Sequence, residues 1–315
     1  MNFPVFDLHC DTADYLAGFY GPDNMFLRNN KVHIDLERGS QLPGYAQCFA
    51  CFTTTDSMLD PVSTFEKKLA AIHRELDRNY DCIRQAFTAT EIEDNYSHGI
   101  MSAILAIEGP AGFGFDPELL EDLYKIGFRF TTLGWNEKNP LTGSHLTGGG
   151  LTDQGREYVH EAQRLGMLVD VSHISDEGFW DIMDITQAPV IASHSNSRAV
   201  HSVSRNITDD MFLEICKTGG VVGINLYPAF LGENASLDSV CDHIFHLLEL
   251  DPTGKHIALG GDLDGIEVLP AGFTGIQDYS ILTERLLHKG LTEDIVMNIF
   301  WNNALEVMKN AVCKH

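Results

Sequence analysis

LVDVSH at residues 168–173 is the stretch that decides the fold of this chain. It is short, is apolar at Leu168, Val169 and Val171, and ends in a histidine. A second run of the same kind, PVIASH at residues 189–194, follows after a segment with helical periodicity. Such runs are typical of strands that are buried on both faces, as in a parallel sheet. Because parallel strands need a long crossover between them, the helix between the two runs completes a β–α–β pattern.

The same alternation extends in both directions from this stretch. We expect strands at residues 5–9, 45–52, 101–107, 128–134, 167–173, 190–194, 221–226 and 257–261. We expect helices at residues 61–86, 117–126, 153–165, 176–186, 209–217, 237–250 and 279–288, and a last one from residue 292. Eight strands that alternate with helices predict a (β/α)8 TIM barrel, an α/β fold, as one domain over residues 1–315. A doubly wound open sheet is the alternative, but it would gather functional residues at one switch point.

The composition restricts the partners of the chain. Its 315 residues include 45 acidic and 21 basic ones, which gives a formal net charge of -24. Nucleic acids and anionic membrane surfaces demand basic patches, so neither is expected as a partner. The N-terminal MNFPVFDLHCDT lacks a basic region before its apolar residues, and no stretch is long and apolar enough to cross a bilayer. We therefore expect a cytoplasmic protein without a membrane anchor.

Side chains that commonly bind metals stand at the ends of the first and third expected strands. His9 and Asp11 are two residues apart, so both leave the same face of an extended backbone. A histidine that hydrogen-bonds a nearby aspartate would give the same pattern without a metal. Glu108 ends the apolar run 103–107, where an unpaired carboxylate would be costly to bury. A loop or helix-capping acid is the alternative for Glu108.

Three further strands end in residues of the same kind. His173 and His194 close neighbouring strands, each directly after a serine, and imidazole is a favoured zinc ligand. Two such histidines on adjacent strands make a purely structural role improbable. Asp262 and Asp264 follow the last expected strand within GGDLDG, where an Asp-Gly turn is the alternative for Asp264.

These residues predict a metal centre with two cations. His9, Asp11 and Glu108 would hold one cation, and Glu108, His173 and His194 the other, with Glu108 shared. Two cations about 3.5–4 Å apart can hold a hydroxide between them and polarise a carbonyl group. The nitrogen-rich ligand set favours Zn²⁺, while Mn²⁺ and Co²⁺ are substitutes that the sequence leaves open.

At this point the sequence resembles the renal (membrane) dipeptidase family of zinc peptidases. The resemblance is carried in order by DLHCDT (7–12), AIEGP (106–110), LVDVSHIS (168–175), PVIASHS (189–195), Arg205-Asn206 and ALGGDLDG (258–265). It implies a barrel of the metal-dependent hydrolase type with two zinc ions per chain and Glu108 bridging them. It also implies a metallo-dipeptidase that cleaves dipeptides, including those with a D-residue at the C-terminal position, and a homodimer.

The resemblance assigns roles to two residues beside the metal ligands. Asp262 would take a proton from the attacking water and pass it to the leaving amine, with Glu108 as the other catalytic carboxylate. Arg205 would bind the terminal carboxylate of the substrate, for which the guanidinium fork is suited. A surface arginine is the alternative for Arg205.

One departure from the family concerns the end of the fourth expected strand. Animal members carry a histidine there that contacts the region of the substrate carbonyl, whereas this chain has Trp135 followed by Asn136. An indole has one donor and no basic nitrogen, so stabilisation of the oxyanion from this side is in doubt. His145, on the loop that follows, is the candidate replacement. Trp135, Asn136 and His145 are therefore expected to contact the substrate.

Two alternatives to a dipeptidase remain at this point. The first is another barrel hydrolase with two metals, acting on a lactone, an ester, a phosphotriester or a cyclic amide. Many such enzymes bridge their metals with a carboxylated lysine on the fourth strand, and residues 131–135 contain no lysine. The second is a non-catalytic binding protein, which only the tryptophan at position 135 favours.

Overall fold

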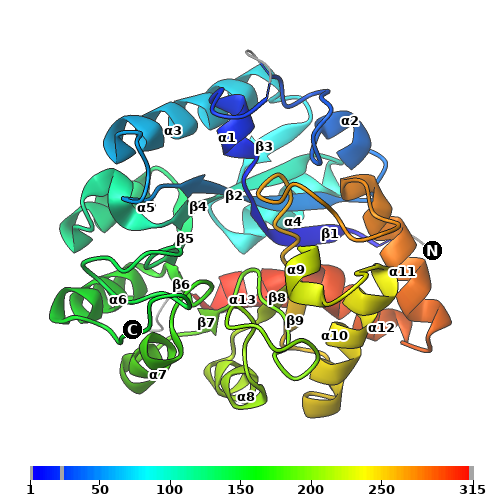
Figure 1. The fold of residues 1–315 in the computed structure, drawn as a ribbon. Coiled ribbons are helices and arrows are strands. Elements are labelled where there is room, and N and C mark those ends of the chain that lie inside the picture. The colour runs from blue at the N-terminus through cyan, green and yellow to red at the C-terminus, as the bar shows by residue number, and fades with distance from the viewer. Residues whose placement is uncertain (1–2, 22–24, 312–315) are drawn as a thin grey trace.

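The fold is a nearly closed barrel of eight parallel strands surrounded by helices (Figure 1). It is seen in a computed structural model that describes residues 3–21 and 25–311. The barrel strands are β1 (Val5–Cys10), β2 (Tyr45–Phe52), β4 (Met101–Glu108), β5 (Phe128–Thr132), β6 (Leu168–Asp170), β7 (Val190–Ile191), β8 (Val222–Ile224) and β9 (Ile257–Leu259).

The order of the strands matches the prediction of a (β/α)8 barrel. Neighbours pair in the order β7-β6-β5-β4-β2-β1-β9-β8. The remaining gap is bridged just beyond β7, where Ala192 N donates to Val221 O at 3.0 Å and Gly223 N donates to Ala192 O at 2.8 Å. The predicted fold class is therefore confirmed, and the open doubly wound sheet is wrong.

One strand was not expected and shortens a predicted helix. The helix predicted at 61–86 ends earlier, as α3 (Pro61–Arg78), because the side-chain amide of Asn79 donates to Glu75 O at 2.8 Å and caps the last turn. Residues Ile83–Gln85 form β3, which pairs with the first residues of β4, before the part of β4 that pairs with β5. Pairing with the edge of a strand here outweighs the helical periodicity of the sequence.

The other predicted helices form close to their expected bounds and cover the outside of the barrel (Figure 1). They start and stop where the sequence provides caps: Thr152 accepts from Gly155 N at 3.0 Å, and Gly166 ends the same helix at a φ of 83°. They are α5 (Leu120–Lys125), α6 (Asp153–Leu165), α7 (Asp176–Ile185), α8 (Asp209–Thr218), α10 (Leu237–Leu250) and α11 (Tyr279–His288). The last predicted helix is divided into α12 (Glu293–Met297), a π-helical segment (Asn298–Asn302) and α13 (Asn303–Asn310).

Several short helices escaped the sequence analysis because they are too brief to show a period. They are α1 (Thr12–Leu16), α2 (Leu36–Gly39), α4 (Ala89–Ser97), α9 (Pro228–Leu231) and the 3₁₀ turns Pro110–Phe113 and Ile276–Asp278. A further 3₁₀ turn, Pro117–Leu119, forms the start of the helix predicted at 117–126. Most of these short helices lie in connections, and α1 follows directly on β1, so that Asp11 becomes its N-terminal flanking residue.

The apolar core has an inner and an outer part. The inner part fills the barrel with strand residues such as Phe6, Ile104 and Phe130, which pack with Trp301 and Leu305 at its lower end. There α13 crosses behind the strands in Figure 1 and closes the barrel opposite the carboxyl ends. The outer part lies between the strands and the helices.

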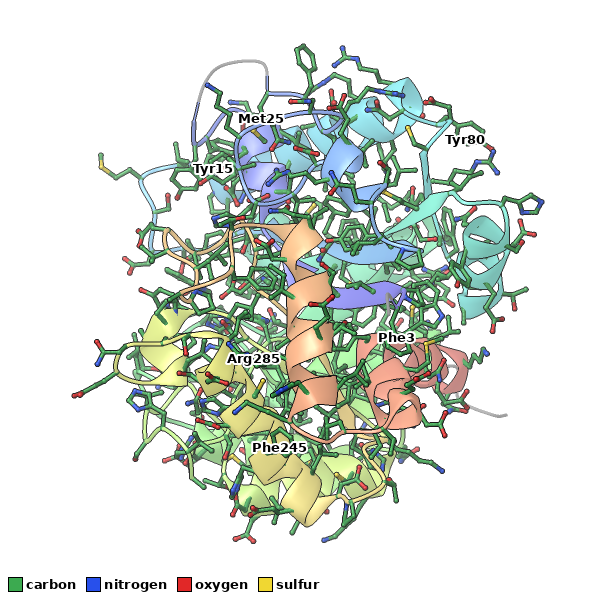
Figure 2. The ribbon with its side chains drawn as sticks, turned by 90° about the vertical axis from the view of Figure 1, so that its right-hand side faces the viewer. Phe3, Tyr15, Met25, Tyr80, Phe245 and Arg285 are labelled. Atoms are coloured by element: carbon green, nitrogen blue, oxygen red, sulfur yellow. The ribbon has the colours of Figure 1, made fainter. Side chains whose placement is uncertain are left out.

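The outer helices are also joined by polar contacts. Figure 2 shows one side of the molecule, with Arg285 on α11 and Phe245 on the neighbouring α10. Arg285 Nε lies 3.8 Å from Asp238 Oδ1 of α10, and Lys289 Nζ lies 2.9 Å from the same oxygen. Among residues 3–21 and 25–311, no helix has both the length and the hydropathy to span a membrane.

Two glycines allow the barrel to narrow near the carboxyl ends of its strands. A Cβ on Gly260 would lie 1.7 Å from the carbonyl oxygen of Ser193, and one on Gly223 would lie 2.0 Å from the same atom. Glycine is required at both positions because backbones from three neighbouring strands approach each other here. The residue after Ser193 is His194, so this close approach also sets the height of that side chain in the barrel.

Candidate metal centre

The predicted ligands come together at the carboxyl ends of the barrel strands, as parallel pairing requires. His9 lies on β1 and Glu108 is the last residue of β4. His173, His194 and Asp262 each lie a few residues beyond β6, β7 and β9, where longer strands had been predicted. The chain turns sharply at two of these residues, with φ values of 71° at His173 and 56° at Asp262.

A bulge in β1 directs His9 into the barrel. The pairing of β1 with β2 slips between Asp7 and Cys10, so one extra residue lies on the β1 side. A bulge of this kind reverses the alternation of faces and re-aims the side chains that follow it. Asp11 is already in the turn that begins α1, with φ -107° and ψ 25°. The prediction that His9 and Asp11 share one face of an extended strand is therefore wrong in its geometry, although the two side chains do meet.

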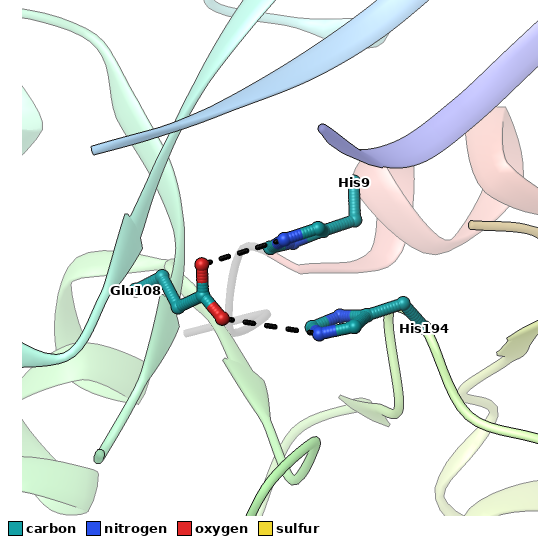
Figure 3. A group of neighbouring side chains, drawn as sticks. All are labelled: His9, Glu108 and His194. Carbon is teal, nitrogen blue, oxygen red and sulfur yellow. Dashed lines mark ion pairs between the residues drawn. The ribbon is translucent and has the colours of Figure 1, made fainter. Parts of the chain in front are cut away.

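The Glu108 carboxylate faces the imidazole rings of His9 and His194 (Figure 3). Its Oε2 is 3.4 Å from His9 Nε2, and its Oε1 is 3.2 Å from His173 Nε2 and 3.9 Å from His194 Nε2. The imidazole rings of His9 and His194 stack with their centroids 3.7 Å apart. One carboxylate thus faces three imidazole nitrogens that belong to three different strands.

Two aspartates complete the cluster on the side of His9. His9 Nε2 is 3.3 Å from Asp11 Oδ2 and 3.9 Å from Asp262 Oδ1. Asp11 Oδ1 is buried and has no hydrogen-bond partner among the described residues. Two ligand groups have a spacing that suits an ion, namely His9 with Glu108 and His194, and His9 with Asp11 and Asp262.

The hydrogen bonds of the outer ring nitrogens determine which nitrogen of each histidine is free. His173 Nδ1 is 3.0 Å from Asn136 Oδ1, and a carboxamide oxygen only accepts, so Nδ1 carries the hydrogen. His194 Nδ1 is 2.6 Å from Ser193 Oγ, and that hydroxyl donates to Asp170 Oδ2, so it accepts from Nδ1–H. Both rings therefore direct an Nε2 lone pair into the cluster.

These lone pairs show that the residues fit a metal. The two Nε2 atoms of His173 and His194 lie 2.9 Å apart without a hydrogen between them, and they face the carboxylate of Glu108. Converging lone pairs and negative charge, together with the unpaired oxygen of Asp11, require a cation for balance. Nitrogen and carboxylate donors in this mixture are the ligands of zinc and similar transition metals.

The pKa values of His173, His194 and Glu108 agree with this interpretation. Burial, with a contribution from the charge of Arg205, lowers the pKa of His173 to about 3, and burial and the charge of His9 hold the pKa of His194 well below its ordinary value. Burial would lower the pKa of His9, but the carboxylates of Glu108 and Asp11 together outweigh it and raise this pKa well above its ordinary value. Burial would raise the pKa of Glu108, but His9 and His173 hold it well below the ordinary value. His173 and His194 as neutral imidazoles and Glu108 as an ionised carboxylate are therefore in the forms that bind metal, whereas His9 would have to release a proton to bind one.

A pocket of about 550 Å³ opens over this cluster. Asp11, Glu108, His173 and Asp262 form part of its wall. The rest includes the residues expected to contact the substrate and several aromatic side chains: Trp135, Asn136, His145, Tyr15, Tyr20, Phe52, Tyr227 and Phe230.

His145 is in the pocket wall but both of its ring nitrogens are engaged. Its Nε2 is 2.9 Å from Asn136 Oδ1 and its Nδ1 is 2.9 Å from Ser204 Oγ. Asn136 therefore joins His145 to His173, which the sequence did not indicate. The indole of Trp135 packs against Phe52, with ring centroids 4.9 Å apart.

Arg205 is almost fully buried beside the pocket and is incompletely paired. Its Nη1 donates to Ser195 Oγ at 2.8 Å, while Nε and Nη2 have no partner among the described residues. The guanidinium carbon is 5.6 Å from the centroid of the Phe230 ring, which lines the pocket. Two free donors of a buried cation form a site for an anion.

The sequence analysis missed two polar residues at the centre, and it correctly left a third, Asp264, out of the predicted metal ligands. Asn225 donates to Asp262 Oδ2 at 3.0 Å, and its place just after β8 repeats the pattern that singled out the other residues. Asp170 supports the histidines from within the barrel, through the backbone of Ser172 and Ser193. Asp264 accepts from the Thr12 hydroxyl and from His33 N, both at 2.6 Å, which is the structural role that its turn motif allowed.

Comparison with known proteins finds similar dipeptidases. An uncharacterised dipeptidase of Schizosaccharomyces pombe is 31% identical over 333 residues, which cover 98% of this chain and 81% of that protein. The dipeptidase verJ of Clonostachys rogersoniana is 28% identical over 98% of this chain and 84% of its own length.

Solved structures of metallopeptidases have the same fold. The crystal structure of dipeptidase AC superposes with a TM-score of 0.90 at 26% identity and covers 99% of both chains. A metallopeptidase of Rhodobacter sphaeroides, solved with a phosphinate mimic of L-Ala-D-Ala, has a TM-score of 0.89 at 24% identity over 99% of this chain and 100% of that one. The profile of the membrane dipeptidase family matches residues 1–314. The family and the enzyme class expected from the motifs are thus confirmed, and the chain belongs to the membrane dipeptidase family of metallopeptidases, peptidase family M19.

Proposed function

We propose that this chain is a zinc dipeptidase that works with two metal ions. The observation that carries the proposal is the meeting of three imidazoles and three carboxylates from five barrel strands beneath one pocket. In the proposal His9, Asp11 and Glu108 hold one zinc ion, and Glu108, His173 and His194 hold the other. Mn²⁺ or Co²⁺ could replace zinc, because the same donor types accept them. When bound, the ions supply a nucleophile by lowering the pKa of water and polarise the peptide carbonyl.

Asp262 is proposed to move the proton. Burial, together with the nearby charges of Asp11 and Glu108, raises its pKa to about 7, although the His9 charge opposes the shift. This value belongs to the metal-free protein. A buried carboxylate beside the cluster can accept a proton and return it, as general acid–base catalysis requires. Asn225 holds Asp262 Oδ2 at 3.0 Å and so leaves Oδ1 directed toward the cluster. In this scheme Asp262 accepts the proton of the attacking water and donates it to the leaving amine.

Arg205 is proposed to select substrates with a free terminal carboxylate. Its two unpaired donors, Nε and Nη2, stand side by side on the guanidinium and match the two oxygens of a carboxylate. Arg205 is buried, so water would compete little for its hydrogen bonds to a bound carboxylate, and the interaction would be strong. The distance from Arg205 to the metal ligands would then limit the length of the peptide.

The substrate class is proposed to be dipeptides, including those with a D-residue at the C-terminal position. The Rhodobacter sphaeroides metallopeptidase of the same fold was solved with a mimic of L-Ala-D-Ala. Trp135, Asn136 and His145 would contact the substrate on one side of the pocket. Since both nitrogens of His145 are engaged, it would act on the carbonyl oxygen only after releasing Asn136 or Ser204.

The proposal is tested by a metal analysis combined with a substrate panel. The panel contains L,L- and L,D-dipeptides, the same dipeptides with an amidated C-terminus, and a set of lactones and esters. We expect about two zinc ions per chain, hydrolysis of the free dipeptides, and loss of activity on amidation or on treatment with a chelator. Hydrolysis of lactones or esters but of no dipeptide would contradict the proposal, and so would full activity in the chelator.

A further inference from the structure

Asp170 is a buried carboxylate inside the barrel that lies behind the two-histidine side of the centre. It ends β6, and 3% of its surface is exposed. Its Oδ1 accepts two backbone hydrogens, from Ser172 N on its own strand and from Ser193 N beyond β7, both at 2.9 Å. Its Oδ2 accepts the hydroxyl hydrogen of Ser193. Each of the two serines directly precedes a histidine of the cluster.

The chemistry of these groups gives the contacts one direction. An ionised carboxylate can only accept hydrogen bonds, so the single hydrogen of the Ser193 hydroxyl is used on Asp170. The Ser193 oxygen then has only lone pairs to offer His194 Nδ1, which lies 2.6 Å away. His194 must therefore carry its hydrogen on Nδ1 and leave Nε2 free.

We propose that Asp170 is a positioning residue that fixes, through the Ser193 hydroxyl, the tautomer of His194 that can bind a metal. Histidine ligands commonly donate their outer ring hydrogen to a carboxylate or carbonyl, which fixes the tautomer and increases the basicity of the ligating nitrogen. Here one hydroxyl is inserted between the carboxylate and the ring. The inference rests on the proposed function, because it concerns a ligand of the proposed centre.

The substitution Asp170→Asn tests this direction because it is almost isosteric. Two backbone N–H groups point at Oδ1, so the carbonyl oxygen of the asparagine has to occupy that place. The amide nitrogen then replaces Oδ2 and donates to Ser193. The hydroxyl then turns its hydrogen to His194 Nδ1, which at 2.6 Å is nearer than the other acceptor, Ser172 Oγ at 3.5 Å, and the ring moves its own hydrogen to Nε2. The hydrogen on Nε2 would then occupy the lone pair of His194 that faces Glu108.

The consequence is an unusual order of affinities. Loss of a partner behind a metal ligand typically lowers metal affinity by about 10–100-fold. We expect about 10-fold weaker zinc binding for Ser193→Ala, in which His194 loses a partner but keeps a free choice of tautomer. We expect about 100-fold for Asp170→Asn, in which the wrong tautomer is enforced. The double variant should return to the level of Ser193→Ala, because the reversal runs through the hydroxyl.

The experiment measures zinc binding to the metal-free protein by competition with a chromophoric chelator. Ser102→Ala is the matched control, since Ser102 is a buried strand serine whose hydroxyl accepts from Asn95 Nδ2 at 3.0 Å away from the centre. It should bind zinc as the wild type does. In the zinc-loaded wild type, the Nδ1–H proton of His194 should give a downfield NMR signal that is protected from exchange and is lost in Ser193→Ala.

The partial recovery in the double variant separates positioning from a merely structural role. If Asp170 only held the strands together, the double variant would bind zinc more weakly than either single one, and the inference would be overturned. Equal affinity of wild type and Asp170→Asn would also overturn it. If Asp170→Asn does not fold, the test rests on Ser193→Ala. Unchanged zinc affinity and an unchanged NMR signal in that variant would overturn the inference. A wild type that binds no zinc would instead overturn the proposed function.

Discussion

The metal-free enzyme should become more stable when Asp262 is replaced by asparagine. Asp262 is buried near two other carboxylates, and its pKa is raised from 3.8 to about 7 in the folded protein. The folded state therefore binds more protons than the unfolded state between these two values. The protonation of Asp262 stabilises the folded state fully below pH 3.8, and this stabilisation is lost as the pH rises to about 7. An asparagine side chain would carry no charge at this position and would not show this loss.

The size of the effect follows from the pKa of Asp262. Between pH 5 and the folded pKa of about 7, the loss is about 1.4 kcal/mol per pH unit, or about 3 kcal/mol in all. Asparagine is also suited to the backbone, because Asp262 has a φ of 56° and asparagine tolerates this left-handed region. The substitution therefore removes a charge without adding strain.

The assay is urea unfolding of chelator-treated wild type and Asp262→Asn at pH 5 and pH 8. Between these values the wild type should lose about 3 kcal/mol more stability than the variant, whereas groups away from Asp262 titrate in both proteins and cancel. The variant should also have little dipeptidase activity while it still binds zinc. An equal change in stability for both proteins would refute the reasoning, because it would mean that the Asp262 charge is not held in an unfavourable place.

Three further substitutions test other parts of the structure. Arg205→Lys keeps the charge but loses the guanidinium fork, so we expect KM for dipeptides to rise about 10–100-fold with unchanged zinc content, measured by initial rates. Gly260→Ala places a Cβ 1.7 Å from Ser193 O, and we expect the free energy of unfolding in urea to fall by about 1–3 kcal/mol or more. Because His194 follows Ser193, this variant should also bind zinc more weakly. Lys68→Met removes the buried partner that lies 2.7 Å from Asp14 and should cost about 3–5 kcal/mol in urea unfolding, most of which Asp14→Leu should restore in the double variant.

The barrel could be predicted because its strands are short apolar runs that are separated by helices with clear ends. The helices at 153–165, 237–250 and 279–288 have the bounds that their periodicity predicts. Capping explains the accuracy of the first of them, which begins after Thr152 and ends at Gly166. The overrun of the helix at 61–86 shows the limit of this reasoning, because nothing local reveals that Ile83–Gln85 pairs with a distant strand.

The meeting of the site residues could also be predicted, since the carboxyl ends of parallel strands share one end of the barrel. The geometry by which they meet could not. The bulge that re-aims His9 is a property of the pairing of β1 with β2, and the left-handed turn at His173 is not marked by a glycine. The engagement of His145 by Asn136 depends on a loop whose course has no period. The roles of the individual residues stay predictions until variants are measured.

Anomalous X-ray diffraction at the zinc edge would test the central claim most directly. We predict two peaks about 3.5–4 Å apart, one on each side of Glu108, with His9 and Asp11 around one and His173 and His194 around the other. No zinc peak in crystals of the zinc-treated protein, or peaks away from Glu108, would contradict the account.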